Sequence, residues 1–396
     1  MPVSHALRRS AADPDPRFEI TFESCDRCGL LQIIDTVDPA ILYGDTDTYQ
    51  TGFHRPRHLD ELITSAIAHQ DPGRVIDIGC NDGSLMEALK RHGYSDIVGI
   101  EPNRVSSDLA VQKGYPVYPE FFTAALAARI LQEHGAFQAI YLRHVAEHVE
   151  ALDEFFPAMR KLLAPGGLLI MELPQVEPGF ALGNPAVLWE EHVNYFTEPL
   201  AAHLLARYGF EILDRRHYAF GGGAIAFIAR RAEMARRPPQ PPPARSAKRL
   251  IQAFRTGFDA YRTRLRKVVG AARNAGYRVA MYGAAPRSCV VAAACGIGAM
   301  IDVVIDDRAD IQGRLMPGTQ RAVLPLDAAL AAIGGKPALC LLGVGSENEF
   351  KVSAKLAAGL HAPATCISLF PPRDTVRSIG AAAAAIKSRQ SRVRPA

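Results

Sequence analysis

The sequence has few of the features that mark membrane, exported or nucleic-acid-binding proteins. No apolar run approaches the roughly 20 residues that a transmembrane helix needs. The N-terminal stretch MPVSHALRRSAADPDP has no apolar core, so we expect no signal peptide. The net charge is only +4 over 396 residues, which argues against a nucleic-acid partner. We predict a cytoplasmic protein without membrane or nucleic-acid partners, and the sequence leaves its oligomeric state open.

Cysteine is also scarce, with seven residues in the chain. Cytoplasmic thiols stay reduced, so any pairing among them concerns metal or chemistry rather than disulfides. The hydrophobic fraction of 48% and the charged fraction of 22% are typical of a globular protein. The chain length suits two or three domains.

A proline-rich stretch, RRPPQPPPARS at residues 236–246, divides the chain. Stacked prolines lack amide hydrogens, so neither a helix nor a sheet continues through them. On both sides, apolar runs alternate with helix-like segments, which predicts an α/β fold with a doubly wound sheet and a second, smaller α/β domain. The late runs EILDRRHY and GGGAIAFIAR are joined too tightly for a crossover helix, so we expect them to be antiparallel. The predicted parts are an N-terminal region (1–56), a first α/β domain (57–235), a linker (236–247), a long helix with the second α/β domain (248–372) and a basic tail (373–396).

The strand RVIDIG ends in a turn that contains acidic, amide and glycine residues. Gly79 and Gly83 let the backbone approach a ligand closely, and the helix that follows presents free amides. Glu101 ends the next strand, where a carboxylate suits two ribose hydroxyls. These features predict a nucleoside-binding site at the carboxyl edge of the sheet.

Two ligands compete for this turn, and a tight turn without a ligand is the third alternative. A dinucleotide site needs G-x-G-x-x-G, and the third glycine is missing. The turn instead resembles motif I of class I methyltransferases, with Asn81 in the place of the middle glycine. We therefore predict S-adenosylmethionine, with Asp77 facing its amino end and Glu101 its ribose. The predicted cofactor-binding residues are Asp77, Gly79, Asn81, Asp82, Gly83, Glu101, Pro102, Asn103, Arg143 and His144.

The stretches DIGCNDGSLMEAL and VGIEPN resemble the sugar C-methyltransferases that act on nucleotide-linked 4-keto-6-deoxyhexoses. YGAAPRS and VIDDRADIQGRLMPGT are similar to two stretches in the C-terminal half of that family. The likeness extends from Cys25 to about Phe370. It implies an N-terminal zinc module, a class I methyltransferase domain and a C-terminal Rossmann-like domain.

The zinc module departs from the family pattern. The family uses two C-x-x-C pairs, and this chain has only Cys25 and Cys28. Zinc takes four ligands in structural sites, and His5 is the only upstream candidate. We predict a degenerate module with substoichiometric zinc or none, and we assign no metal ligands.

The family's catalytic signature matches this chain at Glu191 and His192, and a second family histidine matches His148. The resemblance implies His192 as the base, Glu191 as its orienting partner, His148 as acid or oxyanion partner, and Tyr43 on a loop that closes over the site. Trp189 replaces the family tyrosine, and an indole can donate but not accept a hydrogen bond. The residues predicted to bind substrate are Trp189, Tyr49, Asn194, Tyr282, Gly283, Arg287 and Asp306.

The expected partner is a small molecule, a nucleotide-linked keto-sugar. A carbon beside a ketone becomes nucleophilic when a base removes its proton and forms an enolate. Two alternatives stay open, because the cofactor turn does not identify the acceptor. One is an O- or N-methyltransferase of a natural-product or polysaccharide precursor, and the other is a non-catalytic S-adenosylmethionine-binding subunit.

Overall fold

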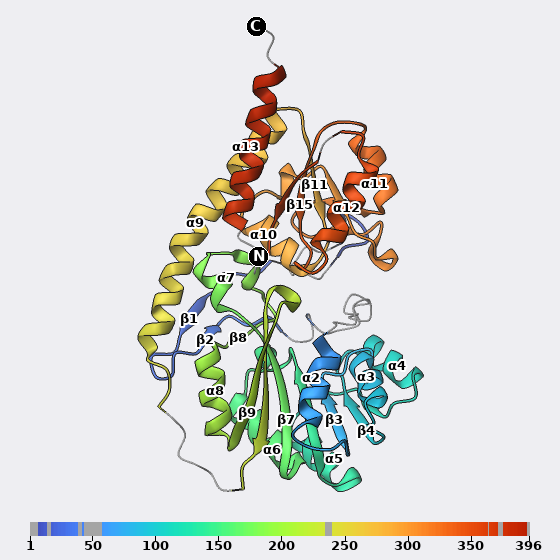
Figure 1. Ribbon diagram of the computed structural model, residues 1–396, viewed down its shortest axis with the longest axis vertical. Coiled ribbons are helices and arrows are strands. Elements are labelled where there is room, and N and C mark those ends of the chain that lie inside the picture. Colours follow the sequence, from blue (N-terminus) through green and yellow to red (C-terminus); the bar gives the residue numbers. More distant parts are fainter. Residues whose placement is uncertain are drawn as a thin grey trace. The chain divides into compact units, whose positions relative to one another are not determined.

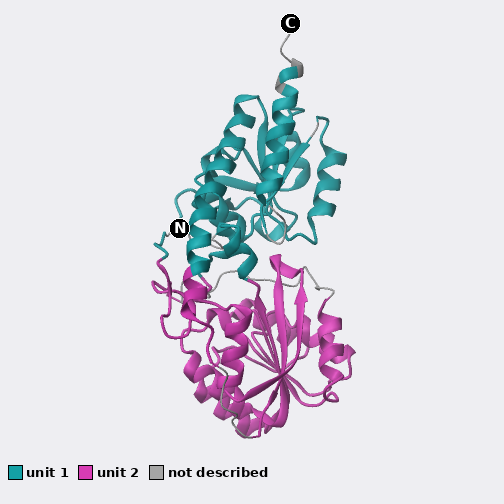
Figure 2. Cartoon of the chain, turned by 60° about the vertical axis from the view of Figure 1, so that its left-hand side comes forward, with its two compact units in different colours: residues 1–20, 176–190, 249–396 teal, residues 21–175, 191–248 magenta. Residues whose placement is uncertain are grey.

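The computed structural model describes residues 7–13, 17–38, 42, 58–233, 240–362, 364–370 and 375–393. The chain divides into two compact units (Figure 2). We call residues 21–175 and 191–248 the seven-stranded unit, and residues 1–20, 176–190 and 249–396 the six-stranded unit, after their main sheets.

The seven-stranded unit has a sheet in the order β5-β4-β3-β6-β7-β10-β9 (Figure 1). Its strands are β3 (Val75–Ile78), β4 (Ile97–Ile100), β5 (Val117–Tyr118), β6 (Phe137–Arg143), β7 (Leu163–Pro174), β9 (Phe210–Tyr218) and β10 (Ala224–Arg231). The first five in this order are parallel, and β10 runs antiparallel to both β7 and β9. The predicted antiparallel pair is therefore confirmed.

Helices cover both faces of this sheet. They are α2 (His58–Ile67), α3 (Ser84–Arg91), α4 (Arg104–Gln112), α5 (Ala124–His134), α6 (Leu152–Leu162) and α8 (Glu198–Arg207). Side chains of α5, α6 and α8 share one core with Ile76 and Ile78, whereas those of α2 and α3 share the other with Val75. Alternate residues of a strand point to opposite faces, so a strand buried on both faces is apolar throughout. The prediction of a doubly wound sheet is confirmed.

A small three-stranded sheet belongs to the same unit. It consists of β1 (Phe22–Ser24), β2 (Leu31–Ile33) and β8 (Asn194–Tyr195), with β2 antiparallel to both neighbours. The N-terminal region is thereby joined to the segment that directly follows His192.

The six-stranded unit repeats the α/β arrangement, in the order β13-β14-β12-β11-β15-β16. Its strands are β11 (Arg278–Tyr282), β12 (Val303–Ile305), β13 (Leu315–Met316), β14 (Arg321–Leu324), β15 (Ala338–Leu342) and β16 (Ala364–Ser368). The helices after residue 175 that belong to it wholly or mainly are α7 (Glu177–Ala181), α9 (Ala244–Asn274), α10 (Pro286–Ala294), α11 (Leu326–Ile333), α12 (Glu349–Gly359) and α13 (Thr375–Val393). Only β13 is antiparallel to its neighbour. The second, smaller α/β domain is confirmed.

The division into units differs from the predicted one at residues 176–190, which group with the six-stranded unit. Ala186 is buried in the core of that unit, and Asn184 donates from Nδ2 to the carbonyl of Leu369 at 2.8 Å. The chain therefore leaves the seven-stranded unit after residue 175 and returns to it at residue 191. The predicted boundaries at 56 and 235 fall outside the described residues.

The predicted basic tail (373–396) also differs from the structure. Residues 375–393 form helix α13, in which Ile379, Ala382 and Ile386 are buried in the core of the six-stranded unit. Their spacing of three and four places them on one helical face, whereas Arg377 and Lys387 are exposed. The charged residues thus mark the outer face of a packed helix.

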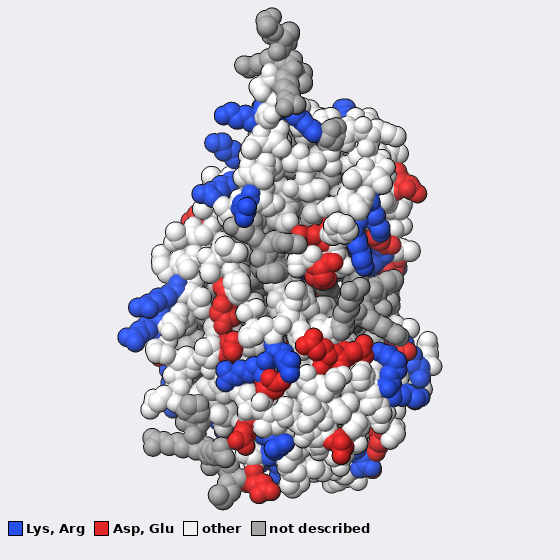
Figure 3. All heavy atoms as spheres, viewed as in Figure 1, with Lys and Arg blue, Asp and Glu red and all other residues white. Residues whose placement is uncertain are grey.

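No helix in the described ranges is long and apolar enough to cross a membrane. On the face shown in Figure 3, acidic and basic side chains are both present, without a continuous basic surface. This mixture agrees with the small net charge of +4.

Candidate functional site

The turn after β3 has a backbone that few residues can adopt. Gly79, Asn81 and Gly83 have φ angles of 78°, 47° and 77°. A Cβ on Gly79 would lie 2.4 Å from Cγ2 of Val145, so only glycine fits there. Asn81 adopts the left-handed conformation, which asparagine tolerates better than most residues with a side chain. This explains why asparagine can replace the middle glycine of the motif.

Glu101 is fixed at the end of β4 by this turn. The backbone amides of Asn81 and Asn103 donate to its two carboxylate oxygens at 2.9 and 2.8 Å. Burial raises the pKa of Glu101, and the two hydrogen bonds lower it. Each oxygen of a carboxylate accepts about two hydrogen bonds, so Glu101 retains capacity for a pair of hydroxyls.

Asp77 is the most deeply buried acid of the turn, with 2% of its surface exposed. Burial raises its pKa to about 7, although the charge of Arg143 opposes the shift. Within the described part of the chain, Oδ2 of Asp77 has no hydrogen-bond partner. A buried carboxylate without a partner costs free energy that a cationic ligand would offset. The ammonium group of S-adenosylmethionine fits this requirement.

The other predicted residues of the turn shape the backbone. Asp82 accepts a hydrogen bond from the amide of Ser84 at 3.1 Å, and Asn103 accepts one from the amide of Ser106 at 3.0 Å. These hydrogen bonds lie at the N-terminal ends of helices α3 and α4. Pro102 directly precedes Asn103, the N-cap residue of α4. Direct cofactor contacts by Asp82, Pro102 and Asn103 stay predictions.

Arg143 and His144 end β6 and belong to a buried network around Glu172. Nε of Arg143 donates to Glu172 at 2.5 Å, and Nε2 of His58 donates to it at 2.7 Å. Burial alone would raise the pKa of Glu172, but Arg143, His144 and His58 hold it well below its usual range. Burial would likewise lower the pKa of His144, but Glu147 and Glu172 raise it to about 9. A cofactor role for Arg143 and His144 stays a prediction.

The sequence analysis missed Glu172 and His58. Glu172 is fully buried, and the parallel register places it directly beside Arg143. The signal was a single carboxylate within the apolar strand GLLIMEL. His58 had no comparable signal, because it opens an ordinary amphipathic helix.

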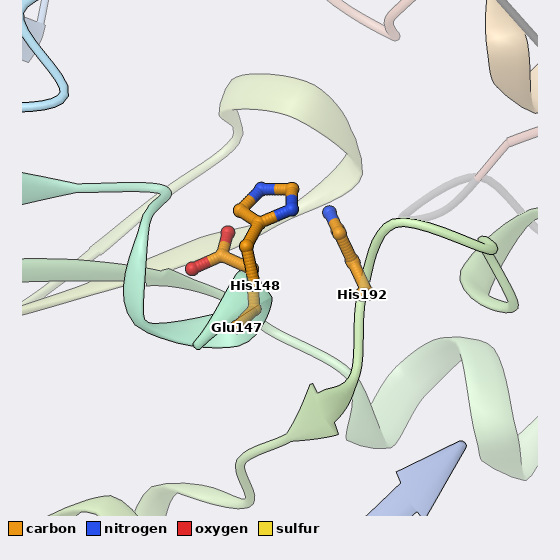
Figure 4. Close-up of side chains that lie close together, drawn as sticks. All are labelled: Glu147, His148 and His192. Carbon is orange, nitrogen blue, oxygen red and sulfur yellow. The ribbon is translucent and has the colours of Figure 1, made fainter. Parts of the chain in front are cut away.

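The structure brings His148 and His192 together, as Figure 4 shows. His148 lies in the short helix η1 (Ala146–His148), and His192 lies just before β8. The ring centroids are 4.9 Å apart, with the ring planes at 85°. Nδ1 of His148 donates to the carbonyl of Glu191 at 2.9 Å. The adjacent Glu147, which the sequence analysis did not select, completes the group.

Asn194 holds this arrangement in place. Its Nδ2 donates to the carbonyl of Val149 at 2.6 Å, and its Oδ1 accepts from Nε2 of Gln32 at 2.9 Å. The side chain thus joins the end of η1 to β2 and β8. Its predicted contact with substrate stays a prediction.

Three other predicted residues lie elsewhere or outside the description. Tyr43 and Tyr49 are outside the described residues. Trp189 is half-buried and falls in the six-stranded unit. Their roles stay predictions.

The turn after β11 in the six-stranded unit resembles the turn after β3. Gly283 has a φ of 99°, and a Cβ on it would lie 2.3 Å from the carbonyl oxygen of Gly343. Asp306 ends the next strand and accepts from the amides of Ala284 and Arg308 at 2.9 and 3.0 Å. A glycine turn and a carboxylate at the next strand's end therefore occur in both sheets.

Tyr282 and Arg287 flank this second turn. The hydroxyl of Tyr282 donates to Asp307 at 2.8 Å, and burial raises the pKa of Tyr282. The guanidinium carbon of Arg287 lies 4.2 Å from the ring centroid of Phe370, and burial lowers the pKa of Arg287 to about 10. A substrate role for the predicted residues of this turn stays a prediction.

Cys25 and Cys28 are free thiols in a turn before β2. Backbone hydrogen bonds from Cys28 and Arg27 lower the pKa of Cys25, which favours its thiolate form. Among the residues described here, the only cluster of metal-binding type is Glu147, His148 and His192. His5 is outside the described residues.

We therefore expect that replacing Cys25 and Cys28 together with serine leaves the zinc content unchanged, since two thiolates supply only half of a structural site. Elemental analysis of both proteins, purified side by side, measures this. A loss of one zinc per chain in the double variant would contradict the expectation and show that distant residues complete the module.

Comparison with protein families matches two descriptions to the chain. Residues 52–215 match a methyltransferase domain, and residues 244–341 match a C-methyltransferase C-terminal domain. The C-methyltransferase NovU of Streptomyces niveus is 26% identical over 341 residues, which cover 82% of this chain and 80% of that protein. The ubiquinone biosynthesis O-methyltransferase of Roseobacter denitrificans is 30% identical over 164 residues, or 37% of this chain and 63% of that enzyme.

Solved structures were matched as well. The 1,6-didemethyltoxoflavin-N1-methyltransferase of Burkholderia thailandensis, with bound S-adenosylhomocysteine, covers 52% of this chain and 95% of its own, at 14% identity and a TM-score of 0.38. The magnesium protoporphyrin IX methyltransferase of Synechocystis PCC 6803, with bound S-adenosylmethionine, covers 44% of this chain and 79% of its own, at 18% identity and a TM-score of 0.34.

The two family matches lie on the two α/β regions, and the likeness to NovU extends over both. The cofactor is S-adenosylmethionine, and Asp77, Glu101 and the glycine turn between them fit it chemically. The chain is an S-adenosylmethionine-dependent methyltransferase that carries a C-methyltransferase C-terminal domain and is similar over both regions to the C-methyltransferase NovU.

Proposed function

We propose that the protein methylates a carbon beside a ketone on a nucleotide-linked deoxysugar, through an enolate. The observation that supports this most directly is the pairing of His148 and His192 near the cofactor turn. Val145, three residues before His148, packs closely on Gly79. A Cβ added to Gly79 would lie 2.4 Å from Cγ2 of Val145. His148 thus belongs to the chain segment that borders the turn, and the ring of His192 lies beside that of His148.

His192 is the proposed base that removes the proton beside the ketone. A neutral imidazole accepts a proton on a ring nitrogen, which is the task of the base. His192 is 8% exposed, so it is largely shielded from water. Bound S-adenosylmethionine supplies an electrophilic methyl group on a sulfonium, which the enolate carbon takes up.

His148 is the proposed partner that holds the ketone oxygen as charge develops on it, and the second candidate for the base. Its hydrogen bond to the carbonyl of Glu191 places one ring proton on Nδ1. In the neutral ring Nε2 is then an acceptor, and only the protonated ring donates from it. We propose that Glu191, 1% exposed, orients the pair through its backbone and side chain.

The six-stranded unit supports the nucleotide part of the proposal. Asp306 offers a carboxylate of the kind that binds ribose hydroxyls, next to the turn from which α10 begins. Gly283 permits close backbone approach, and Arg287 supplies a cation. A role in natural-product biosynthesis and a cytoplasmic location are part of the same proposal.

The test uses a panel of nucleotide-linked keto-sugars in deuterated water, with S-adenosylhomocysteine in place of the methyl donor. We expect the proton beside the ketone to exchange for deuterium, because enolate formation does not require the methyl group. Mass spectrometry measures the exchange. Methylation of the same sugar without any exchange would favour transfer to oxygen, the reaction that the ubiquinone O-methyltransferase relatives are named for.

A further inference from the structure

Glu147, His148 and His192 offer one carboxylate and two imidazole donors in a small space. The ligand atoms of all three lie within 4.8 Å of one another, and they come from η1 and from the segment before β8 (Figure 4). Two imidazoles and a carboxylate are a common ligand set for zinc and for other first-row transition metals. We propose that these three residues bind a divalent transition metal, with zinc as the type ion, and that the bound ion blocks the proposed base.

The distances allow such a site after small side-chain rotations. Zinc–nitrogen and zinc–oxygen bonds of about 2.1 Å place the donors of a tetrahedral site roughly 3.4 Å apart. In the structure, which contains no ion, the three ligand atoms lie within 4.8 Å of one another. The backbone is already held, because Asn194 hydrogen-bonds the carbonyl of Val149 directly after η1. Only side-chain torsions need to change.

Glu147 provides an independent observation, because only one of its two carboxylate oxygens has a cationic partner. Its side chain is 1% exposed, and in the described structure neither carboxylate oxygen receives a hydrogen bond. Oε1 lies 3.3 Å from Nδ1 of His144, as an ion pair without hydrogen-bond geometry. A buried carboxylate is costly unless it is paired and hydrogen-bonded or coordinates a metal. A divalent ion would provide that compensation.

The hydrogen bond of His148 has the form that metal-bound histidines use. Such histidines donate the second ring N–H to a carboxylate or a backbone carbonyl, which fixes the ring and its tautomer. Nδ1 of His148 donates to the carbonyl of Glu191 at 2.9 Å. In this tautomer Nε2 carries the lone pair that an ion would bind. Three protein ligands also leave one coordination position open for water or an oxygen of a ligand.

The inhibition step rests on the proposed function, whereas the binding step does not. A base accepts a proton on a nitrogen lone pair, and a metal ion binds the same lone pair. An ion on His192 would therefore stop proton removal without displacing the cofactor from Asp77 and Glu101. Removal of the ion by a chelator should restore the ability of His192 to accept a proton.

The binding test uses the full-length protein after treatment with EDTA, in a Cys25→Ser, Cys28→Ser background that removes the competing thiolates. Calorimetry with zinc and visible absorption with cobalt should each show one ion per chain. Glu147→Gln and His148→Asn should each weaken binding at least tenfold, because loss of even an outer-shell partner of a metal ligand typically costs about 10–100-fold in affinity. His217→Asn is the matched control, because that exposed ring pairs with Glu198 outside the cluster.

Thermal melting shows whether each variant is folded, and the glutamine variant keeps the shape of the glutamate. Absence of binding, or equal binding by the Glu147→Gln and parent proteins, would overturn the proposal. Saturating zinc should abolish methylation and proton exchange, and EDTA should restore both. Unchanged or increased turnover with zinc bound would overturn the inhibition step. Zinc binding in a protein that methylates no sugar under any condition would leave the metal site standing and reject the proposed function.

Discussion

Replacing His192 with asparagine is expected to lower the methylation rate about 10²–10⁴-fold, the usual contribution of a general base. Asparagine keeps a polar side chain but has no basic nitrogen. Affinity for S-adenosylmethionine should not change, because the predicted cofactor contacts come from the ends of β3, β4 and β6 rather than from the segment before β8. Steady-state rates measured with EDTA present, together with calorimetric cofactor binding, check both parts.

Three further variants make this result specific. His148→Asn ranks the second candidate for the base, and Glu191→Gln should reduce the rate less than His192→Asn if Glu191 only orients the pair. His217→Asn removes an exposed histidine and should behave as the parent protein. A His192→Asn enzyme with a near-parental rate would show that another group removes the proton.

Replacing Asp77 with asparagine is expected to abolish most cofactor affinity and to stabilise the cofactor-free protein. Burial raises the pKa of Asp77 to about 7, against about 3.9 in an unfolded chain. Between these values the folded state binds more protons than the unfolded state, so stability falls as pH rises from about 4 to 7. Asparagine cannot ionise and avoids this loss, which is about 4 kcal/mol at most above pH 7. The stabilisation should therefore be larger at pH 8 than at pH 5.

Denaturation midpoints at pH 5 and pH 8, and calorimetry with S-adenosylmethionine at pH 6, 7 and 8, measure these effects. In the parent protein, affinity should weaken by up to about tenfold per pH unit below pH 7, because protonated Asp77 cannot pair with an ammonium group. Glu101→Ala should also weaken binding clearly. Asp96→Asn, which removes a half-buried acid of the same unit that pairs with Arg74 away from the turn, is the control. Unchanged affinity in both the Asp77 and Glu101 variants would contradict the assigned cofactor site.

The parts of the site that the sequence predicted are those encoded over short distances. Asp77 and Gly83 share one turn, and the carboxylate of Glu101 reaches it across a single pair of neighbouring strands. The meeting of His148 and His192 was implied only by the family resemblance, because 43 residues and a second unit separate η1 from Glu191. The local sequence around each of these two segments does not predict that they lie side by side in the fold.

The network around Glu172 was not predictable for a similar reason. His58, Arg143 and Glu172 come from α2, β6 and β7, and their contacts depend on the strand order rather than on the sequence near any one of them. Helix α13 was missed because its basic residues were more conspicuous than the spacing of Ile379, Ala382 and Ile386. In both cases tertiary packing carried information that the local sequence did not.

The segment Val176–Glu190 limits how this protein can be recombined with its relatives. The proline-rich stretch looks like a natural crossover point, but a chimera joined there would keep Asn184 and take the backbone that accepts its hydrogen bond, here the carbonyl of Leu369 at 2.8 Å, from another protein. It would also separate Ala186 from the core that buries it. A graft of the six-stranded unit must carry residues 176–190 with it as a second, shorter insert.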